Sequence, residues 1–217
     1  MHFLFDLDGT LTNPFQGITG CIQYALSELG HSPPPREELR WCIGPPLRSS
    51  FAEILSTNDP GHLDECLAKY RERFSTIGLY ENRLIDGMVD VLNSLQGERR
   101  HLWVATSKPS VYARRIIEHF GLAPYFQSIH GSELDGTRTN KVELIAHLLR
   151  TEGISPSDAV MIGDREHDVI GAKANGLPVI GVLWGYGSHE ELVASGADEI
   201  CETPAELRHL LQGWIHA

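Results

Sequence analysis

The chain has 217 residues, of which 41% are hydrophobic and 22% are charged, and its formal net charge is −11. This length fits one large domain or a domain with a small insertion, and the hydrophobic fraction is sufficient for a buried core. The negative charge argues against wrapping of nucleic acid, which requires a basic face. No segment approaches about 18 consecutive apolar residues, so we expect no membrane-spanning helix.

The cysteines show neither a CxxC pair nor the spacing of a metal site. We interpret them as small buried hydrophobic residues and expect a reducing, cytoplasmic environment. Asp6 and Asp8 interrupt the short apolar run at the N-terminus, which argues against a signal peptide. The four cysteines concerned are Cys21, Cys42, Cys66 and Cys201.

The first segment is an apolar run with strand character that ends in Asp6 and Asp8, followed by Gly9 and Thr10. Successive side chains of a regular strand point to opposite faces, but two carboxylates can converge where a strand gives way to a loop. A carboxylate in that position can attack phosphorus or carbon, or bind a hard metal ion. The plainer alternative is a strand followed by an Asp-Gly hairpin turn.

Residues 15–81 show a helical pattern throughout. Apolar residues recur at the spacing of an amphipathic helix from Ile18 to Leu29, and Gly30 stands where a C-terminal cap is expected. Shorter helical patterns follow around residues 39–43, 47–55 and 63–74. We therefore predict an all-helical insertion over 15–81.

From Asp86 onward, helical and strand patterns alternate. Apolar strands are predicted at 101–106, 128–130, 159–163 and 178–183, and a final helix from about Pro204. Strands separated by helices predict a Rossmann-like, doubly wound parallel α/β sheet, formed by residues 1–14 and 82–217. Ligands of such sheets bind beyond the carboxyl ends of the strands.

Polar residues stand at these predicted strand ends and helix starts. Taken alone, a threonine there is commonly a cap, a lysine is commonly a surface residue, and Gly-Asp is ordinary turn chemistry. Their occurrence in one order along the chain predicts a shared site. The residues are Thr106, Ser107, Lys108, Lys141, Asp164 and Asp168.

Together with Asp6-Leu-Asp8-Gly-Thr, these residues resemble the four motifs of the haloacid dehalogenase superfamily, along essentially the whole chain. The resemblance implies that Asp6 is the nucleophile, which forms an aspartyl phosphate. It implies that Asp8 is the general acid toward the leaving group and then the base that activates water. The helical insertion resembles the small cap of the first cap class in this superfamily, which determines substrate specificity.

The resemblance also implies how the phosphoryl group and a metal ion are held. Lys141 would neutralise charge between the nucleophile and the phosphate, and Asp168 would support a Mg²⁺ ion. Two carboxylates and a phosphate repel one another, which independently calls for a lysine and a divalent cation. Phosphoryl oxygens would be held by Thr106 and by Gly9, Ser107 and Lys108, and the Mg²⁺ by Asp6, Asp164 and the main-chain carbonyl of Asp8.

Within the superfamily, the chain looks most like phosphoglycolate phosphatases and bacterial 5′-nucleotidases. We expect a Mg²⁺-dependent phosphatase, monomeric or homodimeric, that hydrolyses a small phosphorylated metabolite. Arg48 is a candidate to bind a second anionic group of the substrate, and a surface arginine is an equal interpretation. A phosphosugar mutase and a non-catalytic regulatory protein remain alternatives. Gly185-Tyr-Gly187 lacks the third glycine of a dinucleotide fingerprint, which favours a turn.

Overall fold

The computed structural model describes residues 1–97 and 99–214 and divides the chain into two compact units. Unit 1 comprises Met1–Asn13 and Leu84–Ala217, and unit 2 comprises Pro14–Arg83. The short strands β2 (Thr12–Asn13) and β3 (Arg83–Leu84) pair with each other where the chain leaves and re-enters unit 1.

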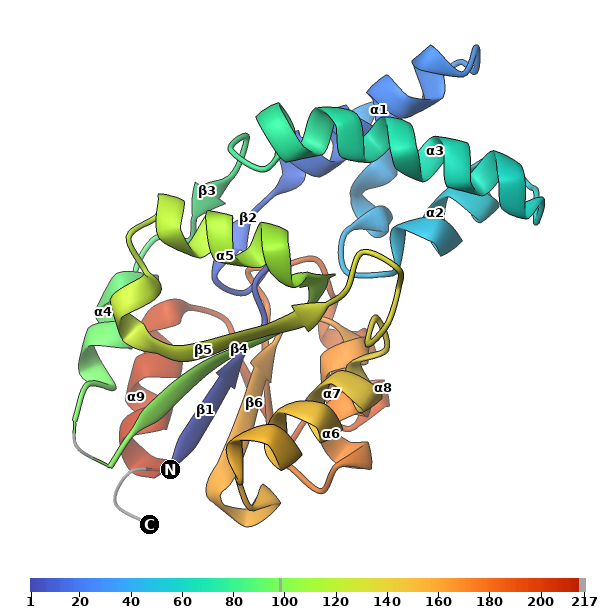
Figure 1. The fold of residues 1–217 in the computed structure, drawn as a ribbon. Helices are drawn as coiled ribbons and strands as arrows, with labels where there is room; N and C mark the ends of the chain where they lie inside the picture. Colours follow the sequence, from blue (N-terminus) through green and yellow to red (C-terminus); the bar gives the residue numbers. More distant parts are fainter. Residues whose placement is uncertain (98, 215–217) are drawn as a thin grey trace. The chain divides into compact units, whose positions relative to one another are not determined.

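Unit 1 is built on a six-stranded sheet in the order β5-β4-β1-β6-β7-β8, and all neighbouring strands are parallel (Figure 1). This arrangement confirms the predicted α/β fold class. β1 lies between β4 and β6, so the carboxyl ends of these three strands share one edge. The strands are β1 (His2–Phe5), β4 (His101–Pro109), β5 (Phe126–Ser132), β6 (Ala159–Gly163), β7 (Val179–Val182) and β8 (Glu199–Cys201).

Helices connect these strands, and α6, α7 and α8 pack beside one another along one side of the sheet (Figure 1). Short 3₁₀ turns at Ala123–Tyr125 and Pro156–Asp158 precede β5 and β6. The helices of unit 1 are α4 (Met88–Ser94), α5 (Ser110–His119), α6 (Lys141–Glu152), α7 (Glu166–Ala174), α8 (His189–Ser195) and α9 (Pro204–Trp214).

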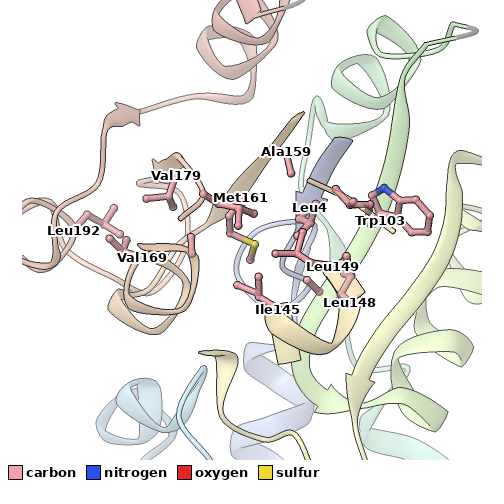
Figure 2. Packing of buried hydrophobic residues seen from close by; sticks show 14 residues of the cluster. Leu4, Trp103, Ile145, Leu148, Leu149, Ala159, Met161, Val169, Val179 and Leu192 are labelled. Carbon is pink, nitrogen blue, oxygen red and sulfur yellow. The ribbon is translucent and has the colours of Figure 1, made fainter. Parts of the chain in front are cut away.

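A hydrophobic cluster holds these three helices against the strands. Leu4, Met161 and Val179 come from neighbouring strands and lie in one cluster with Ile145 of α6 and Val169 of α7 (Figure 2). All five side chains are completely buried. Strands covered on both faces require nearly continuous apolar sequence, as observed here. The packing fixes the starts of α6 and α7 near the carboxyl ends of the strands.

Unit 2 is helical, with α1 (Phe15–Glu28), α2 (Leu47–Ile54) and α3 (Pro60–Arg73). A π-helical turn, Phe74–Gly78, extends α3. The helix predicted around residues 39–43 is a 3₁₀ helix at Arg36–Cys42. Prolines and Gly44 bracket this segment closely, so the helix cannot be extended at either end.

Two features, the end of β4 and helix α8, differ from the elements predicted from the sequence. β4 continues to Pro109 because it pairs with β5 beyond Thr106 after a register shift. Helix α8 was not predicted, since it has only seven residues and depends on Ser188 as its N-cap. The four cysteines are free thiols in buried positions. Across the described residues, no helix has the length and apolar character needed to cross a membrane.

Candidate active site

The predicted site residues of unit 1 lie at the shared strand edge. Asp6 and Asp8 follow β1, Thr106 and Lys108 end β4, and Asp164 follows β6 directly. β1 pairs with both other strands in register, since Phe5 lies opposite Val104 of β4 and Ile162 of β6. Adjacent parallel strands therefore bring side chains together that are more than 150 residues apart in the sequence.

Lys141 is the central cation of the site. Its Nζ lies 2.8 Å from Asp6 Oδ1 and 2.6 Å from Asp168 Oδ1, and it donates a hydrogen bond of 2.8 Å to the carbonyl of Ala105. The contact with Asp168 is a buried ion pair. Burial by itself lowers the pKa of Lys141, but the charges of Asp168 and Asp6 outweigh it and raise the pKa above its usual range. The ammonium therefore stays charged.

Three buried carboxylates, Asp6, Asp164 and Asp168, offer oxygen atoms that all lie within 4.8 Å of one another. Burial raises the pKa of Asp164 well above its usual value, and the charges of Asp168 and Asp6 add to this shift. Burial also raises the pKa of Asp168, to about 6, against the opposing charge of Lys141. One ammonium faces three carboxylates, so a divalent cation with a preference for oxygen ligands fits this donor set.

Glycines allow the chain to approach Asp164 closely. Gly9 has a positive φ of 95°, and a Cβ at Gly9 or at Gly185 would collide with the Asp164 carboxylate. The amide of Tyr186 donates to Asp164 Oδ2 at 2.8 Å, and Thr10 Oγ1 donates to Oδ1 at 3.2 Å. Gly185–Gly187 is therefore a bend whose backbone amides orient Asp164. Sequence reasoning missed this role, and the Gly-x-Gly pattern after a strand was its only local signal.

Asp8 forms a separate ion pair. Lys108 Nζ lies 2.6 Å from Asp8 Oδ2, and both side chains are buried. Burial raises the pKa of Asp8, although the charge of Lys108 opposes the shift. Asp8 Oδ1 is buried and has no hydrogen-bond partner among the described residues. A carboxyl group that retains its proton more readily than usual is suited to general acid catalysis. The pairing of Asp8 with Lys108 was not predicted.

The segment Thr106–Lys108, near the end of β4, is held in place by a local hydrogen bond and by β5. Thr106 Oγ1 accepts a hydrogen bond from the amide of Lys108 at 3.3 Å, and the carbonyl of Ser107 accepts one from Ser132 Oγ at 2.7 Å. A Cβ at Gly131 would come 2.8 Å from the amide nitrogen of Ser110, so β5 passes close to the end of β4. Thr106, Ser107 and Lys108, which are predicted to bind phosphoryl oxygens, therefore lie on a segment that hydrogen bonds and packing hold in place.

Arg48 is the predicted site residue that lies in unit 2, on α2. Its guanidinium forms an ion pair with Asp64 of α3 and donates to the carbonyl of Pro60 at 3.2 Å. The Arg48 side chain is 44% exposed. Within unit 2, Arg48 therefore links two helices, which is the structural interpretation of this residue.

Comparison with protein families places this site in context. The family model described as haloacid dehalogenase-like hydrolase matches residues 3–182. The chain belongs to this family. The match includes every predicted site residue, and it agrees with the resemblance inferred from the four motifs.

Individual relatives carry more specific names. A 5′-nucleotidase of Pseudomonas aeruginosa is 48% identical over 211 residues, which cover 97% of this chain and 95% of that protein. Tyrosine-protein kinase PtkA of Mycobacterium tuberculosis is 40% identical over 185 residues, 85% of this chain but 62% of that longer protein. A crystal structure of a predicted phosphatase from Clostridium acetobutylicum has a TM-score of 0.93 at 42% identity, with 98% of each chain covered.

These findings confirm two predictions, the family and the class of enzyme. The protein is a hydrolase with the fold of this family, and its class is that of the phosphoric monoester hydrolases. The roles of individual site residues, the metal ion and the substrate remain predictions.

Proposed function

We propose that this protein is a Mg²⁺-dependent phosphatase that hydrolyses a small phosphate monoester through an aspartyl phosphate on Asp6. The observation that carries the proposal is the buried cluster of Asp6, Asp164, Asp168 and Lys141 at the carboxyl end of the central strand. Its excess of negative charge favours binding of a cation, and the 2.8 Å contact of Lys141 with Asp6 supports Asp6 as the nucleophile that we propose.

In the first half of the proposed reaction, a carboxylate oxygen of Asp6 attacks phosphorus and the bond from phosphorus to the leaving oxygen breaks. Asp8 gives its proton to that oxygen, and its raised pKa favours the protonated form that this step requires. Lys141 and the amides around Thr106 hold the phosphoryl oxygens. A Mg²⁺ held by Asp6, Asp164 and Asp168 would supply positive charge that reduces the repulsion between phosphate and carboxylates.

In the second half, water attacks phosphorus and the bond between phosphorus and Asp6 breaks. Asp8, now a carboxylate, accepts the proton of the attacking water, and inorganic phosphate leaves. Lys108 Nζ lies 2.6 Å from Asp8 Oδ2 and would keep the Asp8 carboxyl group in place in both halves. One carboxyl group can serve both steps because the first step deprotonates it.

Nucleoside 5′-monophosphates are the substrate class that we put first. The support is the 5′-nucleotidase that is 48% identical across nearly the whole chain. Phosphoglycolate is the second candidate, since a phosphoglycolate phosphatase of Thiobacillus denitrificans is 25% identical over 209 residues. We propose that unit 2 acts as the specificity cap, because it is a separate compact unit inserted directly after the nucleophile segment.

Transfer to an acceptor other than water is the second candidate function. The relative named a tyrosine-protein kinase shares 40% identity with this chain, and a phosphosugar mutase would use the same site residues. All three activities can share an aspartyl phosphate and differ in the group that receives the phosphoryl. The acceptor therefore distinguishes them.

The test is phosphate release from a panel of nucleoside monophosphates, phosphoglycolate and sugar phosphates, with and without Mg²⁺. We expect release that depends on Mg²⁺ and disappears in Asp6→Asn, whose amide cannot act as the attacking carboxylate. Rapid quenching should trap radiolabelled phosphate on the wild-type chain. A tenth of normal activity in Asp6→Asn, or full activity after exhaustive chelation, would refute the mechanism. Preferential transfer to a sugar phosphate or to a tyrosine would favour the second candidate.

A further inference from the structure

The segment Trp184–Gly187, between β7 and α8, contacts two different parts of unit 1. Trp184 Nε1 donates to the carbonyl of Thr10 at 3.0 Å, and the amide of Gly187 donates to the carbonyl of Asp164 at 3.1 Å. Thr10 in turn donates its hydroxyl to the Asp164 carboxylate. The segment therefore binds both the loop after the nucleophile and the acid that follows β6.

Tyr186 binds Asp164 with its backbone amide and Asn13 with its side-chain hydroxyl. Its backbone amide donates to Asp164 Oδ2 at 2.8 Å, and its phenol hydroxyl donates to Asn13 Oδ1 at 2.7 Å. Asn13 is the last residue of β2 and the last residue of unit 1 before the chain enters unit 2 at Pro14. We call the connection at Asn13 and Pro14, where the chain passes from unit 1 to unit 2, the linker. Tyr186 thus contacts both a site carboxylate and the linker.

We propose that Tyr186 is a positioning residue that ties the Asp164 carboxylate to the linker at Asn13. The hydroxyl fixes the linker in the conformation that the structure shows, while the amide fixes the orientation of the carboxylate. This inference rests on the proposed function in one respect: it assumes that substrate binding requires an ordered connection to unit 2.

The hydroxyl contributes to substrate binding because it orders the linker in advance. Without it, Asn13 and its neighbours populate more backbone conformations, and the substrate complex must order them at a cost in free energy. The loss of one hydrogen bond of this kind predicts a rise in KM of about two- to tenfold, with a smaller change in kcat. Mg²⁺ binding should not change, since a phenylalanine keeps the backbone amide that holds Asp164.

The experiment compares Tyr186→Phe with Tyr125→Phe. Tyr125 provides a matched control because its hydroxyl donates to Asn93 Oδ1 at 2.8 Å, again from a partly buried tyrosine to an exposed asparagine. Tyr125 precedes β5 and therefore lies at the opposite end of the strands from the site. Each variant removes one hydrogen bond from a tyrosine hydroxyl to an asparagine side-chain oxygen. We expect the rise in KM for Tyr186→Phe alone, and unchanged Mg²⁺ affinity by calorimetry in both.

Amide hydrogen exchange over residues 10–15 gives a readout that does not depend on activity. We expect faster exchange there in Tyr186→Phe and wild-type exchange in Tyr125→Phe. Asn13→Leu should reproduce the effect, and the double variant Tyr186→Phe/Asn13→Leu should add nothing further, because both changes remove the same bond.

Unchanged exchange in Tyr186→Phe, additive effects in the double variant, or an equal rise in KM for Tyr125→Phe would overturn the inference. A wild-type protein that releases no phosphate from any substrate would instead refute the proposed function. The exchange result would then still decide whether Tyr186 holds the linker.

Discussion

The charged groups of the two units are organised in different ways. In unit 2, Arg73 binds Glu81 with two hydrogen bonds of 2.7 and 2.9 Å, one cation to one carboxylate. In unit 1, Lys141 faces the cluster of Asp6, Asp164 and Asp168, all of them buried. A balanced pair is self-sufficient, whereas an unbalanced buried cluster reduces stability unless a further cation joins it. The imbalance at the carboxylate cluster therefore favours binding of a cation, and the balance of the Arg73–Glu81 pair favours a structural role.

The largest expected effect comes from removing a carboxylate of the cluster. Asp164→Asn should reduce activity at least about 100-fold, since even outer-shell changes at metal sites cost about 10–100-fold. In chelator, the same variant should be more stable than the wild type by about 1–3 kcal/mol, because an amide is not repelled by the buried carboxylates of Asp168 and Asp6. Urea unfolding with EDTA measures this. Mg²⁺ should stabilise the wild type and not the variant. A variant less stable than the wild type in chelator would mean that the cluster is balanced.

Breaking the balanced pair tests the other half of the comparison. Arg73→Ala should destabilise unit 2 by about 1–3 kcal/mol, because the partly buried Glu81 carboxylate loses its partner. The double variant Arg73→Ala/Glu81→Ala should lose less than the sum of the single variants in urea unfolding. Additive losses would show that the two side chains contribute independently, and that the pair is not a unit.

A smaller effect is expected from partly buried histidines of unit 1 outside the site. Burial lowers the pKa of His2, His130 and His147, so the unfolded chain binds protons more readily than the folded one. Stability should therefore fall as the pH decreases through about 6.5, the ordinary imidazole value. Unfolding measured between pH 8 and 5 in the triple variant with glutamine at these positions should show a shallower slope. An unchanged slope would assign the pH dependence to other groups.

The smallest expected effect concerns the exposed pair of unit 2. Arg48→Ala should change stability by less than about 1 kcal/mol, because an exposed ion pair contributes little in water. KM for phosphoglycolate and for a neutral-tailed phosphate ester measures the predicted substrate role. A selective rise for phosphoglycolate would establish a contact with the second anionic group. An equal change in KM for the two substrates would leave Arg48 as a link between α2 and α3.

The sequence was most informative where function depends on local pattern. Asp6 and Asp164 could be located because each follows an apolar strand, and Lys141 because it begins an amphipathic helix. Because the strands are parallel, residues that follow them lie at the same edge of the sheet, independently of the length of the connecting segments. The same logic missed α8, whose seven residues are too few for a clear period.

Tertiary structure decided which of these residues contact one another. The pairing of Lys108 with Asp8 and the contact of Tyr186 with Asn13 join segments about 100 and 173 residues apart in the chain. Such contacts depend on strand register and on loop paths, which hydrophobic periodicity does not report. The positions of the polar residues at strand ends could be predicted from the amino-acid sequence, because strands are recognised from local hydrophobic patterns. The Asp8–Lys108 pair and the Tyr186–Asn13 hydrogen bond could not, since both arise only when distant segments pack together.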